Sequence, residues 1–134
     1  MKASMRELTE PVVFTNFLFL INAKLWYDVG CTGAAIVVGI TGLASFSYHI
    51  PKESFIPTYA FDVCAAHFAL VYTLYIAYPH ISPLRWAALV GILSLGLTFK
   101  KCAHSKGAYE KYHTLWHVCV FVGQCILAQT MPGA

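Results

Sequence analysis

Five apolar segments, separated by turns that contain proline or charged residues, restrict the fold of this chain more than any other feature. Segments of this length and polarity are typical of helices that cross the roughly 30 Å hydrocarbon core of a membrane. Of all residues, 58% are hydrophobic and only 11% are charged, too few charges to cover a soluble domain. We therefore predict a single domain, residues 1–134, that is an all-α, polytopic membrane helix bundle with about five transmembrane helices. The five segments are Val12–Tyr27, Thr32–Ile50, Pro57–Tyr78, Leu84–Phe99 and Tyr109–Thr130.

The basic residues indicate how this bundle is oriented. With five spans, the N-terminus, the turn after Pro51 and the loop from Lys100 to Ala108 share one side of the membrane, and only Lys24 and Arg85 lie on the other. The positive-inside rule places the basic side, with the N-terminus, in the cytoplasm, matrix or stroma. The basic side collects Lys2, Arg6, Lys52, Lys100, Lys101, Lys106 and Lys111.

Charge and cysteine content disfavour other classes of protein. The formal net charge of +3 is small, and no stretch alternates basic with aromatic residues on a polar face, so nucleic acid is not expected as a partner. The five cysteines are odd in number and form no CxxC motif, which argues against a disulfide framework. Residues 1–10 lack the basic-then-apolar layout of a signal peptide, so we expect the first apolar segment to be retained.

The polar residues inside the apolar segments gather near one end of the predicted bundle. Ser45 and His49 lie one helical turn apart at the basic end of the second segment, and Asp62 lies near the same end of the third. His113 and His117 open the fifth segment on that side, also one turn apart. Ionisable groups at such positions are energetically unfavourable and usually functional. We therefore expect all five to lie at a similar depth.

Three of these residues have the chemistry of a metal site. His49, His113 and His117 can supply three imidazole ligands to zinc and leave a fourth position open, as in catalytic zinc sites. Zinc lowers the pKa of bound water to about 7 and so generates a nucleophile. Asp62 is then a candidate general base, and Ser45 can hydrogen-bond the water, the carboxylate or a developing oxyanion. The constellation predicts metal-assisted hydrolysis in a membrane.

The order of these motifs resembles that of a known family. Ser45 to His49 reads S-x-x-x-H, Asp62 follows thirteen residues later, and His113 to His117 reads H-x-x-x-H. This order resembles the CREST superfamily of membrane hydrolases, which includes alkaline ceramidases, progestin and adipoQ receptors and proteins that remodel glycosylphosphatidylinositol anchors. The resemblance implies zinc held by the three histidines, with Asp62 and Ser45 around the catalytic water. It also implies lipid amides or esters as substrates and an endomembrane location.

The chain departs from that family in length. The family has a seven-helix core with three helices between the aspartate helix and the last histidine helix, whereas this chain has room for one, Leu84–Phe99. Because two helices are an even number, their loss does not change the side of the membrane from which the last histidine helix enters. It also removes part of the wall that would enclose a lipid, so a second chain is a possible partner, in a homo-oligomer or a larger membrane complex.

Two other functions are compatible with the sequence. One is a non-catalytic membrane subunit that keeps the fold and a structural metal, with an organelle inner membrane as an alternative location. The other is a haem-binding anchor that uses two of His49, His67, His113 and His117 as axial ligands. We expect His67 to have a structural role, donating a hydrogen bond to a neighbouring helix.

Overall fold

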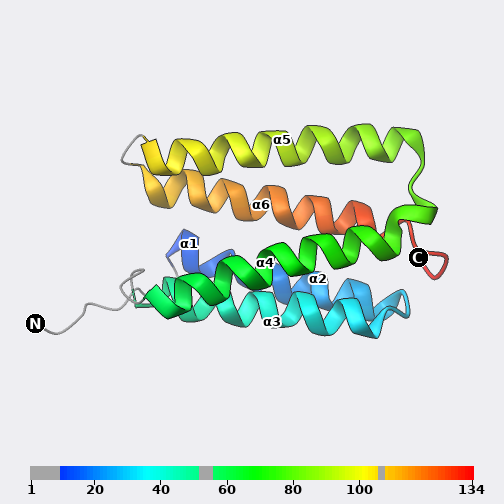
Figure 1. Cartoon of the computed structure of the whole chain (residues 1–134), viewed down its shortest axis with the longest axis horizontal. Coiled ribbons are helices and arrows are strands. Elements are labelled where there is room, and N and C mark those ends of the chain that lie inside the picture. The colour runs from blue at the N-terminus through cyan, green and yellow to red at the C-terminus, as the bar shows by residue number, and fades with distance from the viewer. Residues whose placement is uncertain (1–9, 52–55, 106–107) are drawn as a thin grey trace, which may run out of the picture.

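The computed structural model describes residues 10–51, 56–105 and 108–134, and all regular secondary structure in these ranges is helical (Figure 1). The all-α class is therefore confirmed. The residues on the basic side at 1–9, 52–55 and 106–107, including Lys2, Arg6, Lys52 and Lys106, lie outside the described ranges. In chain order the elements are α1 (Pro11–Phe14), α2 (Phe17–Asp28), α3 (Thr32–His49), α4 (Ile56–Ala77), η1 (Tyr78–His80), α5 (Pro83–Ser105) and α6 (Tyr109–Ala128).

The first predicted segment is two helices and not one. Thr15 and Asn16 separate α1 from α2, and their side chains return hydrogen bonds to the preceding turn. The Thr15 hydroxyl donates to the Pro11 carbonyl at 2.9 Å, and the Asn16 amide donates to the Val12 carbonyl at 3.1 Å. Such bonds compete with the helical ladder and bend the chain. The remaining α2 is only about 18 Å long, too short to span a bilayer alone.

The fifth helix in the structure, α5, is longer than its apolar segment. It begins at Pro83, where proline suits the first turn of a helix, and continues past Phe99 to Ser105. The predicted end at Phe99 was wrong because it followed the loss of hydrophobicity at Lys100 and Lys101. Lysine is a good helix former, so a change in polarity does not end the helix.

Two stretches in the described chain are long and apolar enough to cross a membrane, Pro57–His80 and Pro83–His104. Both carry many exposed apolar side chains; Leu84, for example, is 81% exposed. They support association with a membrane. In the described chain, α2, α3 and α6 do not meet the same criteria of length and mean hydropathy.

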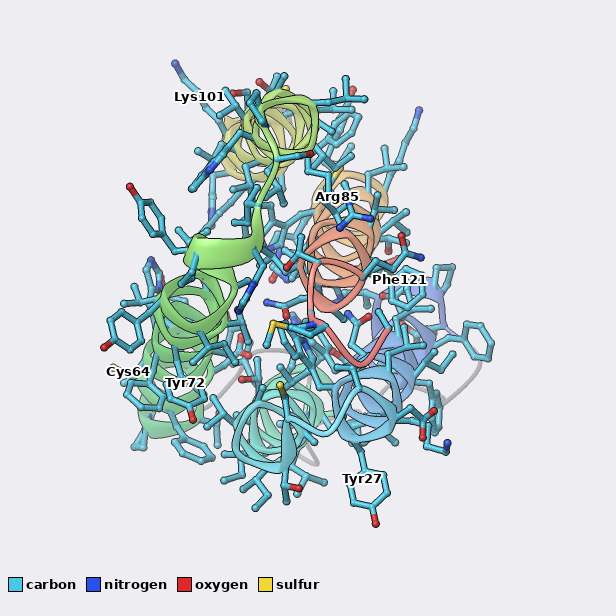
Figure 2. The ribbon with its side chains drawn as sticks, turned by 90° about the vertical axis from the view of Figure 1, so that its right-hand side faces the viewer. Tyr27, Cys64, Tyr72, Arg85, Lys101 and Phe121 are labelled. Atoms are coloured by element: carbon cyan, nitrogen blue, oxygen red, sulfur yellow. The ribbon has the colours of Figure 1, made fainter. Side chains whose placement is uncertain are left out.

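The helices pack in an incomplete ring (Figure 2). α3 packs between α2 and α4, and α6 packs against α5 and α2 and also contacts α1 and α4. Among the described elements, α5 packs on α6 alone, so it does not contact α4 although only η1 and a short turn join the two. At its first turn, α5 is tied to the end of α6 by Arg85, whose guanidinium donates to the Gln129 carbonyl at 2.8 Å.

A buried polar network links three helices inside the ring. The Trp26 indole donates to the Gln124 side-chain carbonyl at 2.8 Å, and the Gln124 amide donates to the Thr73 hydroxyl at 3.1 Å. Thr73 in turn donates to the Ala69 carbonyl at 2.7 Å. A buried polar group that loses its hydrogen-bond partner is costly in an apolar interior. The network therefore favours the one packing of α2, α4 and α6 in which all three side chains are bonded.

Candidate metal centre

Three histidines from α3 and α6 meet inside the bundle. His49 is the last residue of α3, and His113 and His117 occupy successive turns near the start of α6. All three are buried, with at most 8% of the residue surface exposed, and each offers a ring nitrogen within 4.8 Å of those of the other two. The structure thus brings together the three ligands expected from the sequence, in an arrangement that can hold a metal ion.

The nitrogen spacing tests whether a metal fits. The Nε2 atoms of His49 and His113 are 3.1 Å apart, and the centroids of these two rings are 4.7 Å apart. Two nitrogens bound to one tetrahedral ion lie about 3.3 Å apart when each is about 2.0–2.1 Å from it. The observed spacing is close to this value, so the residues fit a small ion such as zinc.

Thr15 orients the third imidazole. Its hydroxyl oxygen lies 2.9 Å from Nδ1 of His117, and both side chains are buried. Because the Thr15 hydroxyl donates to the Pro11 carbonyl at 2.9 Å, we assign its oxygen as the acceptor of a proton on His117 Nδ1. The lone pair of His117 then lies on Nε2, the nitrogen available to a metal.

Sequence reasoning missed Thr15 as part of the site. The only available signal was that Thr15 and Asn16 interrupt an apolar segment with two adjacent polar residues. The bend that these residues produce places Thr15 against α6, 102 positions away along the chain.

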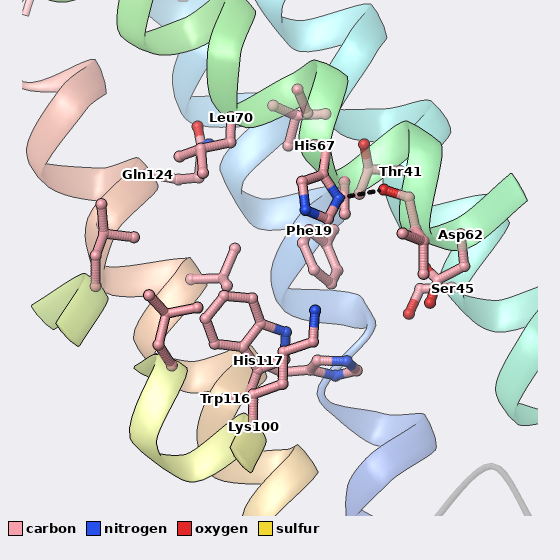
Figure 3. A pocket seen from close by; sticks show the side chains of 18 of the residues that line it. Phe19, Thr41, Ser45, Asp62, His67, Leu70, Lys100, Trp116, His117 and Gln124 are labelled. Carbon is pink, nitrogen blue, oxygen red and sulfur yellow. Dashed lines mark hydrogen bonds between the residues drawn. The ribbon is translucent and has the colours of Figure 1, made fainter. Parts of the chain in front are cut away.

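Asp62 and Ser45 lie together beside the histidines. The Ser45 hydroxyl donates a hydrogen bond to the Asp62 carboxylate, and His49 is close enough to Asp62 for their charges to interact. Ser45 is 1% exposed and lies one turn before His49 on α3. Figure 3 shows Ser45 and Asp62 directed toward each other on the α3–α4 side of the pocket, across from Trp116 and His117.

A cavity of about 190 Å³ adjoins this centre. Its polar end contains Ser45, Asp62, His113 and His117, and it extends between α4 and α5 to Gln124 in the polar network. Side chains from α4, α5 and α6 make the remaining walls largely apolar. These apolar residues include Leu70, Leu74, Leu89, Val90, Leu93, Leu97, Val120 and Leu127.

Trp116 is held in the cavity wall by a close helix contact. A Cβ atom at Gly96 on α5 would lie only 2.8 Å from the Trp116 ring and 3.0 Å from the Cβ of Cys119 on α6. Glycine at this position therefore lets α5 and α6 approach closely, as small residues do between membrane helices. The close approach fixes the indole beside the histidines.

His67 lines the same cavity but stands outside the metal-ligand cluster. Its Nδ1 lies 2.7 Å from the Val63 carbonyl of its own helix (Figure 3), whereas the sequence led us to expect a bond to a neighbouring helix. The difference arises because the carbonyl one turn earlier is within reach of the ring and needs no partner helix.

Known proteins provide no independent guide to this site: the chain matches no protein-family model, no curated protein and no solved structure. Its function must be inferred from the residues of the centre and the cavity beside it.

Proposed function

We propose that this protein is a zinc-dependent intramembrane hydrolase that cleaves an amide or ester bond of a lipid. The observation that carries the proposal is the buried cluster of three histidines, which borders a largely apolar cavity in which Asp62 is the one carboxylate among the described lining residues. Three histidines with an open position are the ligand set of catalytic zinc, whereas structural zinc sites are closed by four protein ligands.

Each residue of the centre has a role in this proposal. His49, His113 and His117 would hold zinc, which would supply Lewis acidity at this centre. Asp62 would accept a proton there as general base. The Ser45 hydroxyl, which donates to Asp62, holds the carboxylate in position. Thr15 presents Nε2 of His117 to the ion.

The cavity supports a lipid as substrate. Its walls are largely apolar and suit an acyl chain, while its polar end lies at the histidine cluster. A bond near the polar head of a lipid would therefore be held at Asp62. An apolar site that excludes bulk water also strengthens the electrostatic interactions on which hydrolysis depends.

The proposed membrane topology has five spans with the N-terminus on the basic side. The two basic residues on the opposite side, Lys24 and Arg85, both form interactions within the protein, which is consistent with this orientation. Lys24 pairs with Asp28 at 2.5 Å, and Arg85 donates to a backbone carbonyl. We further propose that the protein is related to the CREST hydrolases, which its motifs S-x-x-x-H, Asp62 and H-x-x-x-H resemble, and that it lies in an endomembrane.

Metal analysis and an activity assay on the same preparations test the function. Purified protein should contain about one zinc per chain. Asp62→Asn should lower cleavage of a lipid amide or ester by about 100-fold or more while the zinc content stays the same. Asp28→Asn is the matched control, because Asp28 is exposed on α2 and should be dispensable. Zinc-free protein with unchanged cleavage would contradict the proposal.

A second candidate is a non-catalytic subunit in which the metal is structural. The observation that favours it is the lack of packing between α4 and α5, which leaves the cavity incompletely enclosed. In this case a second copy or another membrane protein would cover the gap, and zinc would bind without any lipid cleavage. A haem anchor that uses His49 and His113 as its two axial ligands is disfavoured, since their nitrogens, 3.1 Å apart, leave no space for a porphyrin between them.

A further inference from the structure

Among the described residues that line the cavity, Lys100 carries a charged amine that the proposed reaction does not use. Lys100 lies on α5, faces α6, and lines the cavity at its metal end. Its Nζ atom is 5.5 Å from the centre of the Trp116 ring, close enough for a cation–π interaction. Figure 3 shows the Lys100 chain rising beside Trp116 with the amine directed into the cavity. The neighbouring Lys101, in contrast, is exposed.

The α5 wall is apolar along its whole length until it reaches this amine. The cavity-lining residues of α5 recur at helical spacing on one face, so they form a continuous stripe parallel to the helix axis. A molecule lying along the stripe meets only apolar groups and then a cation beside the histidine cluster. The stripe consists of Trp86, Leu89, Val90, Leu93, Leu97 and Lys100, and His104 continues the α5 lining one turn beyond Lys100.

Lys100 has no carboxylate within ion-pair distance in the part of the chain that the structure describes. Lys100 and Asp62 are close enough across the cavity for their charges to interact, but they form no salt bridge. Lys100 is half-buried, and a lysine ammonium beside a largely apolar wall is a point charge that can form charge-assisted hydrogen bonds with anionic oxygens. The space between Lys100 and Asp62 is also where a substrate of the proposed reaction would lie.

We infer that the lipid that enters this cavity carries an anionic oxygen group, a carboxylate or a phosphate, next to its acyl chain, and that Lys100 binds this group. The inference rests on the proposed function only in that the bound lipid would be cleaved. Binding of the lipid by Lys100 requires no hydrolysis. It narrows the substrate class from lipids in general to anionic ones, and it gives the α5 stripe the role of an acyl-chain wall.

A binding experiment on the full chain tests the inference without relying on catalysis. The protein is placed in nanodiscs of neutral phosphatidylcholine and treated with a chelator, so that a bound metal cannot attract the anion. Oleate, 1-oleoyl lysophosphatidate and neutral mono-oleoylglycerol then compete with a fluorescent monoacylglycerol. At least one anionic probe should bind about tenfold more tightly than the neutral one. A preference for oleate identifies a carboxylate, and a preference for lysophosphatidate identifies a phosphate.

Variants separate a direct contact from a general effect of charge. Lys100→Met should abolish the preference, Lys100→Arg should retain most of it, and Lys101→Met, on the exposed side of the same turn, should leave it intact. The double variant K100M/D62N removes both charges of the cavity. If Lys100 only neutralised Asp62, the double variant would regain the preference; a direct contact requires that it stay lost.

Two results would overturn the inference: equal binding of all three probes to the unmodified protein, or an undiminished anionic preference in Lys100→Met. Its failure is distinguishable from failure of the hydrolase. If the unmodified protein is an active zinc enzyme but binds all three probes equally, only the role of Lys100 is refuted. An inactive protein that still prefers anionic lipids through Lys100 refutes only the hydrolase.

Discussion

The two sides of this bundle are built on different principles. Where α1, α2, α3 and α6 meet, buried polar side chains bond across helices, as Thr15 does to His117 and Trp26 does to Gln124. Where α4 and α5 face each other, the helices do not pack, and their outer surfaces expose apolar residues such as Val71 and Leu84. The first region fixes atoms in place, as a metal site needs, and the second leaves room for an apolar molecule.

This difference suggests a division of labour. Hydrogen bonds between buried groups have one best geometry, so they hold imidazoles at the spacing a metal requires. In a membrane, an apolar helix surface can contact lipid as favourably as protein. No hydrophobic driving force therefore brings α4 and α5 into contact. The variants below test whether the two regions differ in this way.

The largest effect is expected at a metal ligand. His117→Ala should abolish stoichiometric zinc binding, because two histidines no longer form a three-ligand site. The loss of affinity should exceed the roughly 10–100-fold typical of residues that only support a ligand. Zinc titration of the purified protein measures it. His80→Ala, in the exposed η1 turn, is the control, and equal zinc loss in both variants would show that the cluster is not the site.

A buried leucine should matter far more for stability than an exposed one. Leu127 is 1% exposed in the core, so Leu127→Ala should lower the free energy of unfolding by about 2–5 kcal/mol. Unfolding in mixed micelles, followed by tryptophan fluorescence, measures the change. A loss below about 0.5 kcal/mol would mean that the α6 side is not the tightly packed region.

Thr15→Val should weaken zinc binding by about 10–100-fold, because valine has nearly the shape of threonine but cannot accept the His117 Nδ1 proton. Thr15→Ser keeps the hydroxyl and should restore affinity. Nitrogen chemical shifts of His117 report the tautomer directly and should change only in the valine variant. If valine and serine bind zinc equally well, the Thr15 contact does not orient the ligand.

The smallest effect is expected on the outer face of α5. Leu95 is 47% exposed, so Leu95→Ala should change the free energy of unfolding by less than about 0.5 kcal/mol. The same micelle experiment applies. A loss comparable to that of Leu127→Ala would show that another chain covers this face, and it would favour the non-catalytic subunit of a larger assembly.

Much of the organisation was predictable from local sequence. Pro57 and Pro83 mark the beginnings of α4 and α5 to within a residue, because proline suits the first turn of a helix. The i, i+4 spacing of His113 and His117 placed both rings on one face, and the segment pattern put His49 at the same end. The convergence of the three histidines is confirmed, whereas zinc and hydrolysis stay predictions.

Other features were beyond the reach of the pattern. The bend at Thr15 and Asn16 follows from side-chain hydrogen bonds that compete with those of the helix backbone. A hydrophobicity pattern contains no information about such bonds. Lys100 was assigned to a loop because it is charged, yet it continues α5 and enters the cavity. Its position depends on how α5 is rotated against α6, where Gly96 lets the two helices approach.

Apart from the bend at Thr15 and the end of α5, the sequence alone determined the helices and the face on which His113 and His117 lie, because those depend on residues within a few positions of one another. Only the tertiary structure decided which helices would touch. That choice brought Thr15 to His117, 102 positions away, and left α4 and α5 apart around a cavity. Contacts between distant segments depend on the combined packing of all the helices, and no local spacing encodes them.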